Sequence, residues 1–104
     1  MLYVLLHKMK ALVLPEIQMK AIEIVKNRSK LTPGVKELAS YSTIGYPGAI
    51  CVVETNHLEN LVAFLNALSG VGIETRIVPV AEQDEVLQQW EKTLKEAMTQ
   101  RSTY

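Results

Sequence analysis

Ile44-Gly-Tyr-Pro-Gly-Ala-Ile-Cys-Val-Val-Glu54 is the stretch of this sequence that decides its fold. Proline fixes a negative φ and glycine accepts a positive one, so Pro47 and Gly48 suit the two central positions of a type II turn. A segment with β-branched and aromatic residues, 35–44, precedes the turn, and a continuous apolar run, 49–53, follows it. The stretch therefore predicts two antiparallel strands joined as a hairpin.

Before the hairpin, the sequence predicts one strand and one helix. The apolar run at 2–8 contains strand-forming residues and is too short for a helix. Pro15 suits a first helical position, where its missing N–H is harmless, and apolar residues recur at helical spacing after it. Thr32-Pro33-Gly34 ends the pattern. We therefore expect an amphipathic helix over roughly 15–30.

After the hairpin, the sequence predicts a second helix and a fourth strand. Asn56 and Glu59 have the form of a capping box ahead of apolar residues at helical spacing. Gly70 or Gly72 ends that helix, because glycine accepts the backbone conformation of a helix C-terminus. Residues 73–80 then have the composition of a strand.

The end of the chain adds one more helix to this order. Pro79 cannot donate a hydrogen bond to a neighbouring strand, so the fourth strand is expected at an edge of the sheet. A third helix is expected at about 84–99, with one apolar stripe that contains the single tryptophan, Trp90. The order β-α-β-β-α-β with an appended helix is the ferredoxin-like pattern. We therefore predict one α+β domain over 1–104, with its core at 2–82, an antiparallel sheet, two covering helices and an extra C-terminal helix.

Two of the expected strands are apolar on both faces. A sheet with one solvated face shows alternating apolar and polar residues. Residues 2–6 and 49–53 are instead apolar at every position, and two helices cover only one face of such a sheet. The simplest cover for the second face is another copy of the same sheet. We therefore expect a homodimer, or a higher homo-oligomer, through the sheet face. Trp90 either packs onto its own domain or contributes to a subunit contact, and we favour the contact because the first two helices already cover the core face.

Composition and charge exclude several classes of function. Eleven Lys and Arg residues balance eleven Asp and Glu residues, whereas nucleic-acid binders carry an excess of positive charge. The single cysteine and two histidines show no metal-ligand spacing, so we expect no metal and no cofactor. No apolar run approaches the roughly 18 residues of a membrane span, and the N-terminus lacks the features of a signal peptide. We therefore expect a cytoplasmic protein without nucleic-acid or membrane partners.

The strands of this sequence resemble those of a known superfamily. The resemblance lies in Gly34-Val-Lys-Glu-Leu-Ala-Ser-Tyr41, in the stretch from Ile44 to Glu54, and in Ile73-Glu-Thr-Arg-Ile-Val-Pro-Val80. Together these segments look like the small ferredoxin-like proteins of the dimeric α+β barrel superfamily, close to its uncharacterised and GYD-type families. Gly45 and Tyr46 match the first two residues of the GYD pattern, whereas Pro47 stands where that pattern has Asp. The resemblance covers about residues 2–82.

This resemblance implies an assembly more directly than an activity. In the superfamily, two sheets pack face to face in a dimer, and a pocket often lies between sheet and helices. Its members include cofactor-free monooxygenases, lactone isomerases, dehalogenase-like proteins and haem-binding proteins. We therefore expect this chain to bind a small apolar molecule or to act as an interaction module. The alternative is a cofactor-independent isomerase or monooxygenase acting on a small organic substrate.

Three side chains are candidates for catalysis under that alternative. His7, with an ordinary pKa of about 6.5, could act as a general base. Tyr41 or Arg76 could stabilise a developing oxyanion. Each candidate also has a structural interpretation: His7 can be a strand-end residue at the rim of a barrel, and Arg76 can pair with Glu74 on the surface of an edge strand.

Parity and composition assign roles to the other chemically versatile residues. Glu37 and Tyr41 share one parity of the second strand, so they are expected on the same face of the sheet. Cys51 lies within an apolar run and is expected to be a small buried residue, because a reactive thiol needs a polar, partly exposed setting. His57 lies in the first turn of the second helix and is expected to face solvent.

Overall fold

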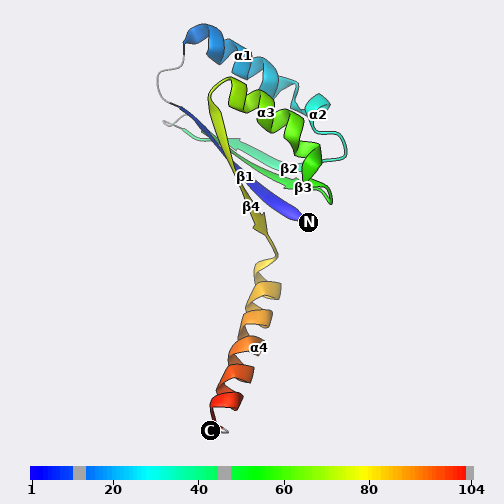
Figure 1. The fold of residues 1–104 in the computed structure, drawn as a ribbon, viewed down its shortest axis with the longest axis vertical. Coiled ribbons are helices and arrows are strands. Elements are labelled where there is room, and N and C mark those ends of the chain that lie inside the picture. Colours follow the sequence, from blue (N-terminus) through cyan, green and yellow to red (C-terminus); the bar gives the residue numbers. More distant parts are fainter. Residues whose placement is uncertain (11–13, 45–47, 103–104) are drawn as a thin grey trace.

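The computed structural model describes residues 1–10, 14–44 and 48–102. Its elements are β1 (Leu2–Met9), α1 (Pro15–Lys26), α2 (Arg28–Leu31), β2 (Lys36–Ser42), β3 (Gly48–Glu54), the 3-10 helix η1 (Leu58–Leu61), α3 (Val62–Gly70), β4 (Ile73–Val80) and α4 (Gln83–Ser102). Helices α1 and α3 lie on one side of the sheet, and α4 extends away from it (Figure 1). The predicted α+β class with the ferredoxin-like order of elements is confirmed.

The four strands form one antiparallel sheet in the order β2-β3-β1-β4. Strand β4 lies at an edge of the sheet, as predicted from Pro79. An edge strand has only one neighbour, so it tolerates a residue that lacks a backbone N–H. Strands β2 and β3 pair as the predicted hairpin, and the backbone N–H of Thr43 donates to the carbonyl oxygen of Gly48 over 3.0 Å. The expected type II turn includes residues 46 and 47, which lie outside the described residues.

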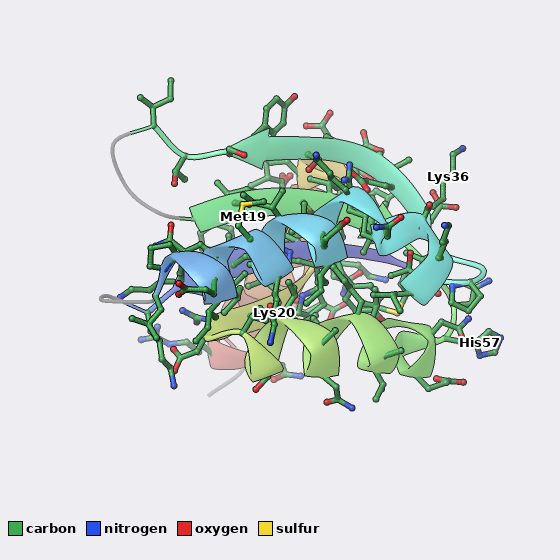
Figure 2. The ribbon with its side chains drawn as sticks, turned by 90° about the horizontal axis from the view of Figure 1, so that it is seen from above. Met19, Lys20, Lys36 and His57 are labelled. Atoms are coloured by element: carbon green, nitrogen blue, oxygen red, sulfur yellow. The ribbon has the colours of Figure 1, made fainter. Side chains whose placement is uncertain are left out.

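Side chains alternate between the two faces of the sheet, and the helices cover one of them. Along β1, Tyr3 and Leu5 are buried, whereas their neighbours Leu2 and Val4 are only half-buried. Helices α1 and α3 lie side by side above the covered face (Figure 2). This arrangement follows from the period of two along a strand, since every second residue points toward the helices.

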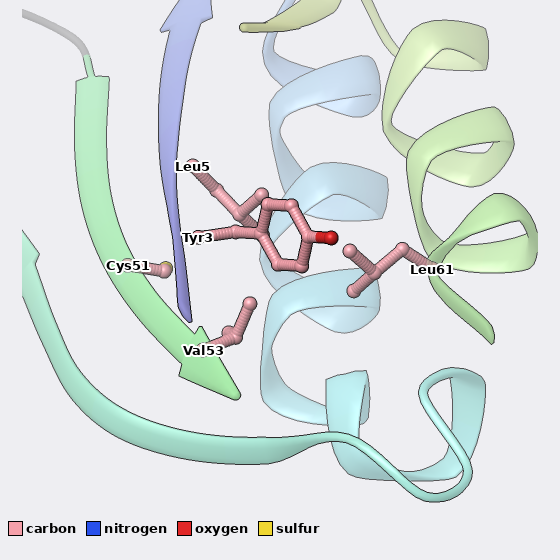
Figure 3. Close-up of a cluster of buried hydrophobic side chains, with 5 residues drawn as sticks. All are labelled: Tyr3, Leu5, Cys51, Val53 and Leu61. Carbon is pink, nitrogen blue, oxygen red and sulfur yellow. The ribbon is translucent and has the colours of Figure 1, made fainter. Parts of the chain in front are cut away.

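The core under the helices consists of two adjoining clusters of buried side chains. The first comprises Tyr3, Leu5, Cys51, Val53 and Leu61 (Figure 3). The second comprises Ala21, Phe64, Leu68, Val71 and Ile73. Burial of a large aliphatic side chain stabilises a protein by about 1.5–3 kcal/mol. The two clusters therefore anchor both helices to the sheet and determine where any hollow between them can lie.

The first helix is shorter than the sequence predicts. The apolar spacing indicates one helix over 15–30, but α1 ends at Lys26 and α2 is a separate short helix. Asn27 interrupts them: its backbone leaves the helical conformation, and its side-chain amide donates to the carbonyl oxygen of Glu23 over 2.9 Å. Asparagine competes in this way for backbone groups, which explains the break.

The predicted capping box of the second helix is also wrong. Neither η1 nor α3 has a side-chain hydrogen bond at its cap position. Instead, the hydroxyl oxygen of Thr55 accepts a hydrogen bond from the backbone N–H of His57 over 3.1 Å. The side chain that accepts a backbone hydrogen bond ahead of this helix is therefore Thr55 and not Asn56, and the helix begins with the 3-10 turn η1.

A β-bulge in β2 corrects the expected placement of Glu37. The register between β2 and β3 shifts between Glu37 and Ala39. Glu37 consequently pairs with Val53, which is buried under the helices, whereas Tyr41 pairs with Ile50 on the opposite face. One inserted residue moves the side chains of all preceding strand residues to the opposite face of the sheet. Glu37 and Tyr41 therefore lie on different faces.

The face of the sheet opposite to the helices is mainly apolar, with Arg76 of β4 in the row of Leu6 and Ile50, and it is uncovered in the single chain. We call this surface the open face. Its apolar side chains are Leu2, Val4 and Leu6 of β1, Ala39 and Tyr41 of β2, Ile50 and Val52 of β3, and Val78 and Val80 of β4. Several of them are exposed by more than a third, including Leu6 and Ile50. None of the helices in the part of the chain described here combines the length and apolarity of a membrane span.

Truncation of one buried leucine tests the assignment of the core. Leu68 is 1% exposed, and Leu68→Ala should lower the free energy of unfolding by about 2–5 kcal/mol, because the cavity left behind does not refill. Leu58, which is 41% exposed, provides the matched control. Leu58→Ala should cost about 1 kcal/mol or less. Urea denaturation followed by circular dichroism measures both, and equal losses would contradict the proposed core.

Candidate functional site

A pocket of about 340 Å³ lies between α1 and the covered face of the sheet. Its walls are mainly apolar and come from helices α1 and α3 and from the ends of β1 and β4. The apolar wall residues are Ala21, Ile22, Val25, Phe64, Leu68, Met9 and Ile73. Pockets of this size and lining are typical of sites for small organic molecules.

Small side chains explain why a hollow remains under α1. The strands below the helix contribute Ser40 and Ser42 from β2, and Gly48, Ala49 and Cys51 from β3. None of these residues reaches far from the sheet, so α1 rests on its neighbours without filling the space beneath it. Close packing is the rule inside proteins, and a gap of this size is therefore a specific feature of the fold.

His7 lines the pocket together with three other titratable residues, Lys26, Arg28 and Cys51. It lies on β1, and its Nδ1 is 2.7 Å from the hydroxyl oxygen of Thr75 on the neighbouring strand β4. Its ring meets the ring of Phe64 edge to face, with 5.9 Å between the ring centroids. Two elements thus hold the imidazole in one orientation.

The other ring nitrogen of His7 has no hydrogen-bond partner. Nε2 is buried, and nothing within residues 1–10, 14–44 and 48–102 donates to it or accepts from it. A buried polar atom left in this state costs about 1–3 kcal/mol. His7 also lines the pocket, and a bound water or a ligand could supply the missing partner.

Burial also determines the charge of His7. Desolvation lowers the pKa of the imidazole below its ordinary value of 6.5, so the ring is neutral at neutral pH. A neutral imidazole has one donor and one acceptor nitrogen. The Thr75 hydroxyl can serve Nδ1 in either role, so Nε2 can be presented to the pocket as a donor or as an acceptor.

An ion pair ties the end of α1 to the sheet at one side of the pocket. The guanidinium of Arg28 donates to both carboxylate oxygens of Glu37, over 2.7 and 3.1 Å, and to the carbonyl oxygen of Val25 over 2.8 Å. This bidentate contact lowers the pKa of Glu37 and raises that of Arg28. The charge of Arg28 is therefore balanced locally, and the residue holds the wall of the pocket in place.

The structure does not bring the three catalytic candidates together. His7 faces the helices, whereas Tyr41 and Arg76 lie on the opposite face of the sheet. Tyr41 and Arg76 belong to the same row across the strands, but two strands separate them, which corresponds to roughly 14 Å at about 4.8 Å per strand. Arg76 also does not pair with Glu74, whose carboxylate contacts Lys10 over 3.2 Å.

The structure also shows the surroundings of Cys51, His57 and Thr75. Cys51 is 6% exposed, as expected of a buried residue, and its sulfur lies 3.5 Å from the hydroxyl of Ser40. His57 is exposed, also as expected, and its Nδ1 lies 3.3 Å from Glu59. Among the described residues, no three His, Cys, Asp or Glu side chains gather as a metal site would require. Thr75 was missed, because its contact with His7 depends on the register between β1 and β4.

The neutral state of His7 predicts a pH-dependent stability. Below pH about 6.5, the unfolded chain binds a proton at His7 before the folded protein does. The free energy of unfolding is therefore at its full value above this pH. It decreases as the pH falls toward the lowered folded-state pKa of His7. The melting temperature of the His7→Gln variant should depend less on pH between about 7.5 and 5 than that of the wild type.

His57→Gln is the matched control for this experiment, because the ring of His57 lies in solvent. It should keep the pH dependence of the wild type. Thermal unfolding at a series of pH values measures all three proteins. Identical slopes for wild type and His7→Gln would mean that His7 titrates in the folded protein as it does in the unfolded chain.

A family model described as "Domain of unknown function (DUF3303)" matches residues 1–94. This range includes His7, Thr75, the small residues under α1 and the first half of α4. Comparison with curated proteins gives no match. Because the family model covers most of the chain, this protein belongs to the family described as "Domain of unknown function (DUF3303)".

Proposed function

We propose that this protein binds a small, largely apolar molecule in the pocket under α1, and that it does so as a homodimer joined through the open face. The observation that carries the proposal is the unpartnered Nε2 of His7 beside an apolar cavity of about 340 Å³. The apolar walls provide affinity through burial of the ligand, and His7 provides one directional hydrogen bond.

The state of His7 narrows the class of ligand. Because Nε2 is a donor in one tautomer and an acceptor in the other, a hydroxyl group satisfies it in both cases. A neutral imidazole offers no charge to attract a strong anion at this position, and of the two cations in the lining Arg28 is paired with Glu37 and Lys26 is exposed. We therefore infer a ring-sized alcohol or phenol, with its hydroxyl at His7 and its apolar body against Phe64 and α1.

The position of His7 also favours a second candidate function. A neutral imidazole whose Nδ1 is oriented by Thr75 has the protonation state of a general base. This supports the cofactor-independent isomerase or monooxygenase as an alternative. Tyr41 and Arg76 of the same chain lie across the sheet from His7, so an oxyanion would need other donors. Conversion of a bound substrate that is lost in His7→Gln and kept in His57→Gln would favour the enzyme.

The open face supports the homodimer. Apolar side chains from all four strands lie there without cover in the single chain, as in a domain core cut in half. A second copy of the same face is self-complementary under a twofold axis. The resemblance to the dimeric α+β barrel superfamily supports the same arrangement, with a pocket between sheet and helices in each subunit.

A pair of related probes tests the ligand site. Naphthol should bind roughly tenfold more tightly than naphthalene, because its hydroxyl makes a hydrogen bond worth about 1–1.5 kcal/mol with the buried nitrogen. The preference should vanish in His7→Phe, which keeps a ring but loses both nitrogens. Isothermal titration calorimetry or a thermal-shift assay measures these affinities.

Two substitutions of alanine by leucine locate the binding of the probes. Ala49→Leu fills the pocket next to His7 and should abolish binding of naphthol, whereas Ala63→Leu on the exposed side of α3 should leave it unchanged. Binding that survives Ala49→Leu would place the site elsewhere. A preference for naphthol that survives His7→Phe would remove His7 from the recognition of the hydroxyl.

A charged substitution on the open face tests the homodimer. Ile50 is already 38% exposed in the single chain, so Ile50→Lys should fold but should convert the dimer to a monomer, because it buries an unpaired charge at the interface. Val62→Lys, at a residue 49% exposed on α3, is the control and should remain dimeric. Sedimentation velocity measures both, and a wild type that is monomeric at micromolar concentrations would contradict the proposal.

A further inference from the structure

Helix α4 leaves the domain and exposes an apolar stripe. It spans 20 residues, and every side chain described in it is exposed. The molecule measures 66 Å along its longest axis because α4 extends beyond the end of β4 (Figure 1). Trp90 is 61% exposed and Leu94 is 50% exposed, although leucine is among the residue types most often buried and tryptophan is highly buried on average.

The spacing of this stripe indicates the shape of the surface that covers it. Leu87, Trp90, Leu94 and Ala97 are three, four and three residues apart, which is the spacing of the a and d positions of a heptad. Glutamine, lysine and glutamate occupy most positions around the rest of the helix. Val86 and Met98 extend this seam at its two flanks, and an apolar stripe that follows a and d positions in this way matches another helix lying along it.

The helix needs a partner from outside its own domain. Most helical stability in proteins comes from tertiary packing of an apolar face, and the apolar stripe of α4 has no such packing in the single chain. The domain that carries α4 does not bury any of its described side chains. We propose that α4 packs along its seam, in parallel, against the α4 of a second copy of this chain.

Charge near the seam favours the parallel arrangement. In a parallel pair, Glu91 lies opposite Val86 of the second copy, and Thr93 lies opposite Met98, so no like charges meet across the seam. An antiparallel pair brings the two copies of Glu91 to the same flank near the middle of the helices, where they repel. The parallel pair therefore avoids a repulsion that the antiparallel pair incurs.

This pairing rests on the homodimer proposed above. The seam covers only about two heptads, which is too short to hold two free helices together. Only residues 81 and 82 separate β4 from α4. If the twofold axis of a dimer joined through the open face runs along the strands, both α4 helices lie at the same end of the dimer. The short connection then gives each helix a high effective concentration near the other. One axis then relates the two sheets and the two α4 helices.

Fluorescence of the single tryptophan, read beside sedimentation velocity, tests the pairing. In the dimer, Trp90 should emit at a shorter wavelength than a free tryptophan amide, because the seam buries it. Leu94→Lys should move the emission to the longer wavelength and raise the dimer dissociation constant roughly tenfold or more. Gln88→Lys, outside the seam on the same helix, is the control and should change neither quantity.

Cysteine cross-linking tests the orientation independently of dimer stability. In a Cys51→Ala background, Leu87→Cys should form an intermolecular disulfide with itself, because a parallel pair places the two copies within disulfide range. Gln88→Cys should cross-link far more slowly. Cross-links found only in a mixture of Leu87→Cys and Ala97→Cys would overturn the parallel arrangement.

The combined results separate failure of this inference from failure of the homodimer. A dimer with a solvent-exposed Trp90, or with no disulfide in any α4 variant, overturns the pairing of α4 and leaves the open-face dimer standing. A dimer that withstands Ile50→Lys but not Leu94→Lys overturns the open face as the interface, and with it the arrangement in which one axis relates the two sheets and the two α4 helices. A wild type that is monomeric at all concentrations overturns both.

Discussion

Side chains alternate between the two faces of the sheet, and in β1 and β3 both faces receive apolar residues. The position of the core and the uncovered apolar surface of the sheet both follow from this constraint. Helices α1 and α3 cover one face and build the two clusters of the core around Leu5 and Leu68. The open face and the stripe of α4 remain apolar and uncovered in the single chain, and we propose that a second copy covers both.

The candidate pocket results from the same covered face. Where β1 and β4 carry large side chains, the helices pack closely, but β2 and β3 carry small residues such as Ser42 and Ala49 below α1. His7 lies between these regions, held through Nδ1 by Thr75 and with Nε2 unpaired in the described part of the chain. A neutral, oriented imidazole beside an apolar hollow is suited to recognise a small molecule with one polar group.

Much of the fold could be predicted because local patterns carry it. The hairpin signal, the apolar periodicities and Pro79 give the order of elements and one edge of the sheet. The bulge after Glu37 and the helix break at Asn27 could not be predicted, since each depends on hydrogen bonds that compete with a regular pattern. His7 was named as a candidate, but its partner Thr75 lies 68 residues away in the sequence.

The sequence by itself determined the fold class, the excess of apolar strand residues and the apolar stripe of the last helix, because period and composition are local properties of a chain. Only the tertiary structure decided which face each polar residue occupies. It set His7 among the pocket residues, separated it from Tyr41 and Arg76, and joined Glu37 to Arg28. The physical reason is register: a shift of one residue in a strand exchanges its two faces, and register is settled by packing between strands distant in the sequence.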